Sequence, residues 1–143
     1  MEGNDKHIKT AHMVLGRDLN HHDTLFAGQG ASYLIECGFL AAQGFLDTTD
    51  IVFLGLDGFR FWRPVRKGET FALKSTLVAA GRTSVAVHVL LTVHDEAAAE
   101  AFATFVRVDG GGNATAHGLS LPPLTGAAAL LRQRYDRYQE AGR

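Results

Sequence analysis

The chain has 143 residues, which is enough for one domain with its own hydrophobic core but too few for a two-domain dehydrogenase or a TIM barrel. Its 14 Lys and Arg residues against 15 Asp and Glu residues give a formal net charge of −1, which argues against a general nucleic-acid binder, and its 46% of hydrophobic residues exclude bulk disorder. The single cysteine, Cys37, excludes an intrachain disulfide and a cysteine-built metal site, and we expect it to be a buried, unreactive thiol.

Polar residues begin the chain, and residues 1–7, MEGNDKH, lack the apolar core of a signal peptide. Residues 9–15 predict a short first strand. Residues 16–23 predict a loop, because polar, turn-favouring residues cluster there. Either Asp23 or Thr24 is a candidate cap for the helix that follows.

Residues 25–46 predict a long helix whose apolar positions follow helical spacing. Small side chains predominate in it, so we expect another element to pack close to its backbone. It is a poor membrane span, because glycine, serine, glutamine and the acidic Glu36 interrupt it. A helix buried on most sides of a soluble protein fits better, and we therefore expect a cytoplasmic protein with no membrane partner and no nucleic-acid partner.

The rest of the chain changes to a strand pattern, with strands expected at residues 51–61, 71–79, 83–93 and 100–108. The third of these alternates cleanly, and its aliphatic side chains share one face: Val85, Val87, Val89, Leu91 and Val93. After a loop with two prolines, Pro122 and Pro123, we expect an amphipathic C-terminal helix at about residues 124–140, with its arginines facing solvent. Short turns between the strands imply antiparallel neighbours. The pattern predicts an α+β fold in which one antiparallel sheet curls around the long apolar helix.

Four short stretches of the sequence resemble the motifs of one family. They are residues 20–28, NHHDTLFAG; residues 61–69, FWRPVRKGE; residues 81–84, GRTS; and residues 104–106, TFV. Together they resemble the hotdog-fold acyl-CoA thioesterases, and most closely the acyl-CoA hydrolase branch, over residues 12–109. The resemblance implies one hotdog domain over residues 1–143, with a five-stranded antiparallel sheet around a central helix in a core of about 8–109, and the C-terminal helix as an extension.

The chain departs from the family pattern at particular positions. Asp23 and Ala27 stand where the usual motif has glycine. The family's usual catalytic carboxylate falls at Ile35, and the nearest acid, Glu36, comes one residue later. One residue is about 100° of rotation around a helix, so the offset turns the acid to a different side.

Glu36 is the candidate catalytic carboxylate, because it is the only acid between Thr24 and Leu46. A carboxylate among apolar neighbours is costly unless it is paired or solvated in a cleft, and burial would raise its pKa into the range of a general base. Two alternatives are an acid on the exposed stripe of the helix and an ion pair at a subunit contact.

Asn20, His22 and Gly28 complete the candidate catalytic group. An amide can orient water or donate to a thioester oxygen, and a histidine can shuttle protons. The N–H of Gly28 lies near the helix start, where the dipole and the free N–H groups favour a developing oxyanion. Loop structure is the alternative for Asn20 and His22, and close packing is the alternative for Gly28.

Basic residues in the predicted turns are candidates for binding the phosphates of coenzyme A, since arginine binds phosphate through forked hydrogen bonds. Together with two adjacent hydroxyl residues they are Arg63, Arg66, Lys67, Arg82, Thr83 and Ser84. A solvated rim is the alternative. We expect no metal site, because His88 and His94 are roughly 20 Å apart in a strand and are interpreted as ordinary strand residues.

The resemblance implies an enzyme that hydrolyses acyl-CoA to free acid and coenzyme A, with no cofactor beyond the coenzyme A of its substrate. It also implies a homodimer with a sheet continuous across both subunits, often assembled into tetramers or hexamers, and an active site between two subunits. Two alternatives stay open. One is an acyl-CoA hydratase or dehydratase in which His22 works with Glu36, and the other is a non-catalytic acyl-CoA-binding module.

Overall fold

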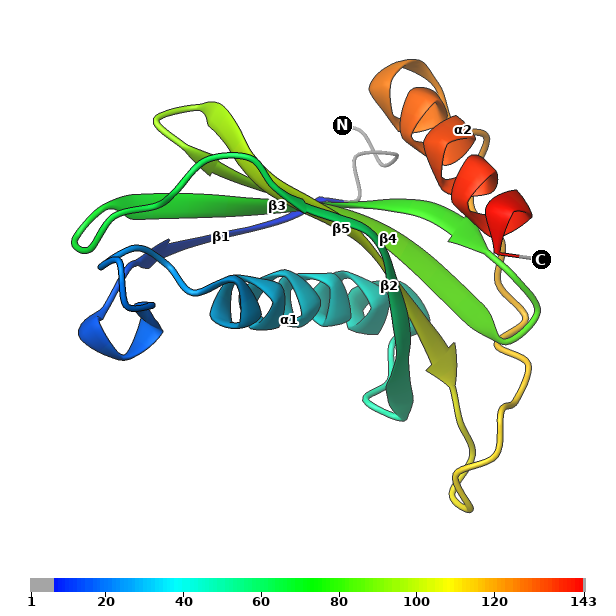
Figure 1. Ribbon diagram of the computed structural model, residues 1–143. Helices are drawn as coiled ribbons and strands as arrows, with labels where there is room; N and C mark the ends of the chain where they lie inside the picture. The colour runs from blue at the N-terminus through cyan, green and yellow to red at the C-terminus, as the bar shows by residue number, and fades with distance from the viewer. Residues whose placement is uncertain (1–6, 143) are drawn as a thin grey trace.

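A five-stranded antiparallel sheet, in the order β1-β3-β4-β5-β2, forms the frame of the computed structural model, which describes residues 7–142. The strands are β1 (His7–Met13), β2 (Ile51–Phe61), β3 (Thr70–Ala80), β4 (Ser84–Val93) and β5 (Glu96–Arg107). Helix α1 (Ala27–Leu46) lies in the concave face of the sheet, and helix α2 (Gly126–Ala141) lies on the opposite face (Figure 1). The expected fold, a sheet around a central helix with a C-terminal helix added, is confirmed. None of the helices in the described range is long and apolar enough to cross a membrane.

Two residues, His94 and Asp95, form the turn between β4 and β5, with left-handed φ angles of 52° and 64°. Positive φ at both central residues is typical of type I′ hairpin turns, whose usual sequences contain Asn-Gly or Asp-Gly. The dipeptide His94-Asp95 lacks this hairpin-turn signal. The sequence pattern therefore predicts that the last strand starts at Glu100, whereas β5 begins at Glu96. The predicted place of His94 in a strand is therefore wrong.

Helix α1 begins at Ala27, later than the pattern predicts, and its N-cap residue is Phe26, which makes no side-chain capping bond. Both predicted cap residues belong to the preceding loop. Asp23 has a left-handed φ of 62°, and the N–H of Thr24 donates to the side chain of Asn20. The predicted cap at Asp23 or Thr24 is therefore wrong.

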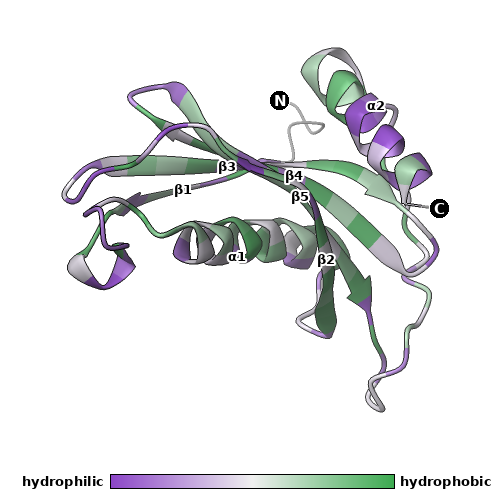
Figure 2. Cartoon of the chain, in the orientation of Figure 1, coloured by the Kyte–Doolittle hydropathy of each residue, from purple (hydrophilic) through white to green (hydrophobic). Residues whose placement is uncertain are grey.

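The inner face of the sheet packs on α1. The aliphatic side chains predicted to share one face of β4 are all buried in this layer: Val85, Val87, Val89, Leu91 and Val93. A Cβ atom on Gly38 would lie 3.3 Å from the Phe105 ring, and one on Gly30 would lie 2.8 Å from the Phe61 ring. The small residues of α1 therefore let the sheet approach its backbone, as predicted, and Figure 2 shows the apolar strands that curl over it.

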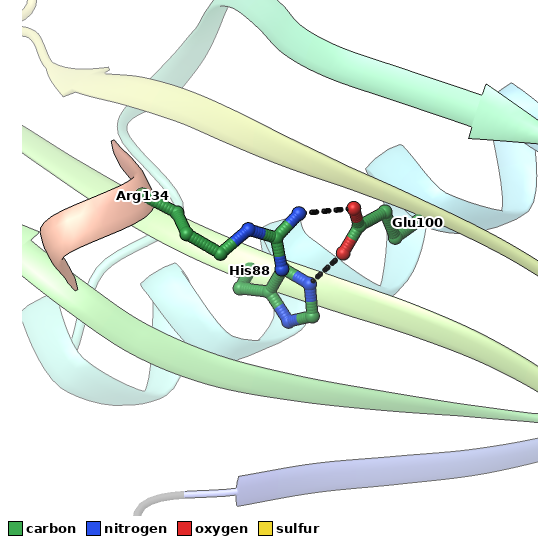
Figure 3. A network of polar contacts seen from close by, with 3 residues as sticks. All are labelled: His88, Glu100 and Arg134. Atoms are coloured by element: carbon green, nitrogen blue, oxygen red, sulfur yellow. Dashed lines mark hydrogen bonds and ion pairs between the residues drawn. The ribbon is translucent and has the colours of Figure 1, made fainter. Parts of the chain in front are cut away.

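The outer face of the sheet carries a second, smaller apolar cluster under α2. It consists of Val78, Ala79, Ala86 and Phe102, against which Leu131, Tyr135 and Tyr138 of α2 pack. No residue of α2 is fully buried. The expectation that the arginines of this helix face solvent is wrong for Arg134, which pairs with the buried Glu100 of β5 (Figure 3).

Cys37 is buried as predicted, with 1% of its surface exposed. Burial raises the pKa of its thiol. A raised pKa lowers the fraction of reactive thiolate, which agrees with an unreactive structural cysteine.

Candidate active site

Residues 20–24 form a loop that the side chain of Asn20 closes. Its Oδ1 accepts hydrogen bonds from the N–H groups of His22 (2.8 Å) and Thr24 (3.1 Å), and its Nδ2 donates to Thr24 Oγ1 (2.9 Å). The Asn20 amide thus stabilises the loop conformation, which is the structural alternative to a catalytic role for Asn20. One Nδ2 proton of the amide remains for another acceptor. His22 is exposed, and its ring lies 3.9 Å from that of His21 between centroids.

Asp18, which the sequence pattern does not mark, fastens this loop to α1. Its carboxylate is completely buried and accepts hydrogen bonds from the Leu15 N–H (2.9 Å), Gln29 Nε2 (3.0 Å) and the Tyr33 hydroxyl (3.1 Å). Burial alone would raise the pKa of this carboxyl, but these donors outweigh it and lower the pKa, so Asp18 is held ionised. One donor, Leu15, precedes Asp18 in the sequence, and the other two, Gln29 and Tyr33, lie on α1. No local sequence motif therefore identifies Asp18.

The first turn of α1 presents backbone N–H groups at the end of this loop. The N–H of Phe26 donates to the Asp18 carbonyl (2.8 Å), and the N–H of Gly30 donates to the Phe26 carbonyl (2.9 Å) as the first bond of the helix. The N–H groups of residues 27–29 precede that bond, and no side chain caps them. Such groups carry the positive end of the helix dipole, so the oxyanion role predicted for Gly28 has a donor of the right kind.

A shallow groove of about 460 Å³ runs along the face of α1 that points away from the sheet. It is lined by Gly28, Ala31, Ser32, Ile35, Glu36 and Phe39. Glu36 is exposed and forms no ion pair with any described residue, whereas Ile35 is partly buried against the core. Within one chain Glu36 therefore lies on the exposed stripe of the helix.

Gly28 and Glu36 line the same groove but lie far apart along it. Positions 28 and 36 are eight residues apart, which is about 12 Å along the helix axis. A general base and an oxyanion donor must each come within about 3 Å of groups on the same reacting centre, directly or through one water. The N–H of Gly28 and the Glu36 carboxylate of a single chain are therefore not adjacent to each other.

Three of the predicted coenzyme A residues, Arg63, Arg66 and Lys67, lie between β2 and β3 beside the Asn20 loop. Thr24 pairs with Arg66 in an isolated bridge, which holds this turn against the loop. Arg63 already pairs with Glu96, on a solvent-exposed edge. Arg66 and Lys67 are exposed, and within residues 7–142 neither side chain forms an ion pair, although the backbone N–H of Arg66 donates to the Glu69 carboxylate (2.7 Å).

The other three predicted coenzyme A residues, Arg82, Thr83 and Ser84, lie at the opposite end of the sheet, where β3 turns into β4. Since β3 has 11 residues, roughly 35 Å separates this turn from the Asn20 loop. His117 covers the turn: its N–H donates to the Arg82 carbonyl (3.2 Å), and its ring bonds the Ser84 carbonyl (3.0 Å). A single chain does not bring the two sets of predicted coenzyme A residues together.

The end of the molecule around the Asn20 loop therefore combines free helix N–H groups with two unpaired cations, and the solvated carboxylate of Glu36 lies further along α1. Among residues 7–142 no group of three or more His, Cys, Asp or Glu side chains is placed to hold a metal ion. The donors suit an anionic ligand that carries a polarisable carbonyl.

Known sequences are similar to a large part of this chain. A family model described as the thioesterase superfamily matches residues 22–99, which is more than half of the 143 residues. A Bacillus subtilis (strain 168) protein, named uncharacterized acyl-CoA thioester hydrolase YkhA, is 31% identical over 113 residues. The match covers 75% of this chain and 64% of that relative, so the chain spans just under two thirds of its length.

Solved structures share the fold over nearly the whole chain. One is an acyl-CoA hydrolase from Staphylococcus aureus in complex with butyryl coenzyme A, coenzyme A and coenzyme A disulfide. Its TM-score is 0.83 at 22% identity, over 96% of this chain and 84% of that one. Another is an apo-hexameric acyl-CoA thioesterase with a TM-score of 0.85 at 24% identity, over 95% of this chain and 90% of that one.

Proposed function

Because the chain belongs to the thioesterase superfamily, we propose that it hydrolyses acyl-CoA thioesters to a free acid and coenzyme A, at a site that two subunits form together. The spacing of Gly28 and Glu36 along α1 carries the proposal, since a second chain laid over the groove would bring its own Glu36 close to Gly28 of the first. The substrate class is supported by the relative named as an acyl-CoA thioester hydrolase and by the similar structure that holds butyryl coenzyme A.

The edge strand β2 supports the pairing of two chains. Within the described part of the chain its outer edge has no neighbouring strand, and Val52, Phe53 and Leu54 are 48%, 43% and 67% exposed. An open, apolar strand edge is an aggregation hazard unless another strand pairs with it. Pairing of β2 with the same strand of a second chain, around a twofold axis, would remove this edge.

Antiparallel pairing at β2 would also bring the two halves of the site together. In such a dimer, the end of the sheet that carries the Asn20 loop in one subunit would lie next to the end that carries the Arg82 turn in the other subunit. The basic residues that a single chain separates by roughly 35 Å would then flank one binding region. Arg66 and Lys67 of one subunit, together with Arg82 of the partner subunit, would bind the phosphates of coenzyme A there.

In the proposed reaction, Glu36 of one subunit takes a proton from a water molecule, and the water oxygen attacks the thioester carbonyl carbon. The oxyanion that forms is held by the N–H of Gly28 of the partner subunit. The carbon–sulfur bond then breaks, the acid is released, and the proton on Glu36 passes to the thiolate of coenzyme A. Asn20 donates its remaining Nδ2 proton to the water or to the thioester oxygen. His22, in the same loop as Asn20, is a candidate proton carrier in addition to Glu36.

A panel of acyl-CoA substrates of graded chain length tests the function, with the free thiol of coenzyme A measured as the product. We expect thiol release that is first order in enzyme and depends on chain length. Loss of an enoyl-CoA double bond without thiol release would identify a hydratase instead. Tight acyl-CoA binding without turnover would identify a binding module.

A charge on the β2 edge should break the assembly. Leu54→Asp places a carboxylate on the most exposed apolar residue of this strand, where pairing would bury it. We expect the unaltered protein to sediment as a dimer or larger at micromolar concentration and Leu54→Asp as a monomer. Leu119→Asp is the matched control, because Leu119 is also an exposed apolar residue, 44% exposed, but lies outside β2, and it should leave the assembly intact. A stable monomer of the unaltered protein would contradict the proposal.

Removal of the Arg82 side chain should weaken coenzyme A binding. A hydrogen bond to a charged group contributes about 1.5–3 kcal/mol, so Arg82→Ala should raise KM for acyl-CoA with little change in kcat. The effect should be smaller for an acyl thioester of N-acetylcysteamine, which lacks the nucleotide. Arg137→Ala, an exposed arginine of α2, serves as the control. Equal losses with both substrates would show a folding role for Arg82.

A further inference from the structure

The turn between β3 and β4, which carries Arg82, is held by the stretch of chain that follows β5. The Gly81 N–H donates to the Ser84 carbonyl (3.0 Å), so Arg82 and Thr83 lie at the tip of the turn. Residues 108–117, called here the return segment, leave β5 and pass this turn on the way to α2 (Figure 1). The proposed hydrolysis assigns no role to the return segment.

Hydrogen bonds of its own give the return segment a defined shape. Val108 and Ala114 form an antiparallel bridge, and the Thr115 N–H donates to the Arg107 carbonyl (2.9 Å). The segment therefore folds back on the end of β5, and this fold places His117 against the turn.

Three consecutive carbonyl groups of the turn accept hydrogen bonds from this side. The Thr83 carbonyl accepts from the Arg107 N–H of β5 (2.8 Å). The Arg82 carbonyl accepts from the His117 N–H (3.2 Å), and the Ser84 carbonyl accepts from His117 Nε2 (3.0 Å). His117 thus bonds the turn on both sides of Thr83. The Arg82 side chain, in contrast, is exposed and bonds no described residue.

The ring of His117 has one fixed orientation. The residue is 9% exposed, and its ring centroid lies 6.3 Å from that of Phe45 in the last turn of α1. Its Nδ1 accepts from the Leu119 N–H (3.0 Å). Since a backbone N–H can only donate and a carbonyl can only accept, the neutral ring with its proton on Nε2 satisfies both partners.

We propose that His117 is a positioning residue for coenzyme A, which fixes the backbone of the turn so that the Arg82 guanidinium meets a phosphate in the right orientation. A forked hydrogen bond to phosphate demands a defined geometry. A turn that is ordered before binding also loses less conformational freedom when the ligand binds. The inference rests on the proposed function, because it takes Arg82 as the residue that binds coenzyme A.

Isothermal titration of the full chain with coenzyme A tests the inference. His117→Ala should weaken the affinity about two- to tenfold, the contribution of one neutral hydrogen bond. KM for an acyl-CoA should rise in the same proportion, whereas KM for the N-acetylcysteamine thioester, which lacks the nucleotide, should change less. Asn113→Ala is the matched control, because Asn113 is an exposed polar residue of the return segment whose side chain bonds no described residue, and the affinity should stay unchanged.

Two conservative variants separate the two ring nitrogens of His117. His117→Gln places an amide near the position of Nε2, and His117→Asn places one near the position of Nδ1. The glutamine variant should bind coenzyme A nearly as well as the unaltered protein, because it still donates to the Ser84 carbonyl. The asparagine variant should bind as weakly as His117→Ala, although it still accepts from the Leu119 N–H. The reverse order of affinities would overturn the inference.

A double-mutant cycle shows whether His117 acts through Arg82. In an Arg82→Ala background, His117→Ala should weaken coenzyme A little further, and fully additive losses would overturn the inference. A His117→Ala protein with unchanged affinity, beside an Arg82→Ala protein with weakened affinity, would overturn the inference and leave the proposed function standing. Failure of the unaltered protein to bind coenzyme A would overturn both.

Discussion

Replacement of Glu36 with glutamine is expected to lower kcat by about 10²–10⁴-fold, the usual contribution of a general base. The change removes the negative charge and keeps the size of a side chain that is exposed in the single chain, so the fold should survive. Acyl-CoA affinity should change little, because binding depends on the basic turns. Steady-state kinetics with a short-chain and a long-chain acyl-CoA would measure both quantities.

Two further variants sharpen the result for Glu36. Glu140→Gln, at an exposed acid of α2, is the matched control and should retain full turnover. The double variant Ile35→Asp with Glu36→Gln moves the carboxylate one residue back, to the position that the family normally uses. Near-normal turnover of Glu36→Gln alone would rule out Glu36 and direct the search to Asn20 and His22.

Acid should destabilise the protein through Glu100. Burial alone would raise the pKa of this carboxyl, but hydrogen bonds from His88 and Arg134 outweigh it and lower the pKa from 4.5 to about 2. A carboxyl with a lowered pKa stabilises the folded state above its unfolded pKa, and this contribution is lost as the pH falls towards the folded pKa. The shift corresponds to roughly 3 kcal/mol, so the free energy of unfolding should decline between pH 5 and pH 2.

Glu100→Gln separates this contribution from the general effect of acid. The variant should be less stable than the unaltered protein at pH 7, because Arg134 loses its ionised partner, and its stability should fall less between pH 5 and pH 2. Glu96→Gln, on the same strand, is the matched control, since its pair with Arg63 is exposed and contributes at most about 1 kcal/mol. Denaturant unfolding at fixed protein concentration measures all three proteins. Parallel pH curves for Glu100→Gln and the unaltered protein would contradict the assignment.

Periodicity in the sequence was sufficient to predict the sheet and its central helix. The alternation from Val85 to Val93 gave the buried face of β4, and the small residues of α1 predicted the close approach that Gly30 and Gly38 make. These features repeat over many residues, so single exceptions do not hide them. The turn at His94 and Asp95 was missed because its left-handed backbone is not encoded by glycine or asparagine.

The polar networks could not be predicted, because they depend on tertiary register. His88 meets Glu100 only through the pairing of β4 with β5, and Arg134 reaches Glu100 from a helix on the far side of a long loop. Asp18 likewise collects donors from two elements. For the candidate site, the sequence identified residues that the fold then distributed over two ends of the sheet, and a single chain does not bring them together. The proposed pairing of two chains would unite them.

The distance between Gly28 and Glu36 along one helix has a genetic consequence. If each reaction centre takes its N–H donor from one polypeptide and its carboxylate from the other, two differently defective alleles can compensate for each other. A cell that expresses a Gly28→Pro allele and a Glu36→Gln allele together would assemble mixed pairs. In each mixed pair one centre inherits both lesions and the other inherits neither.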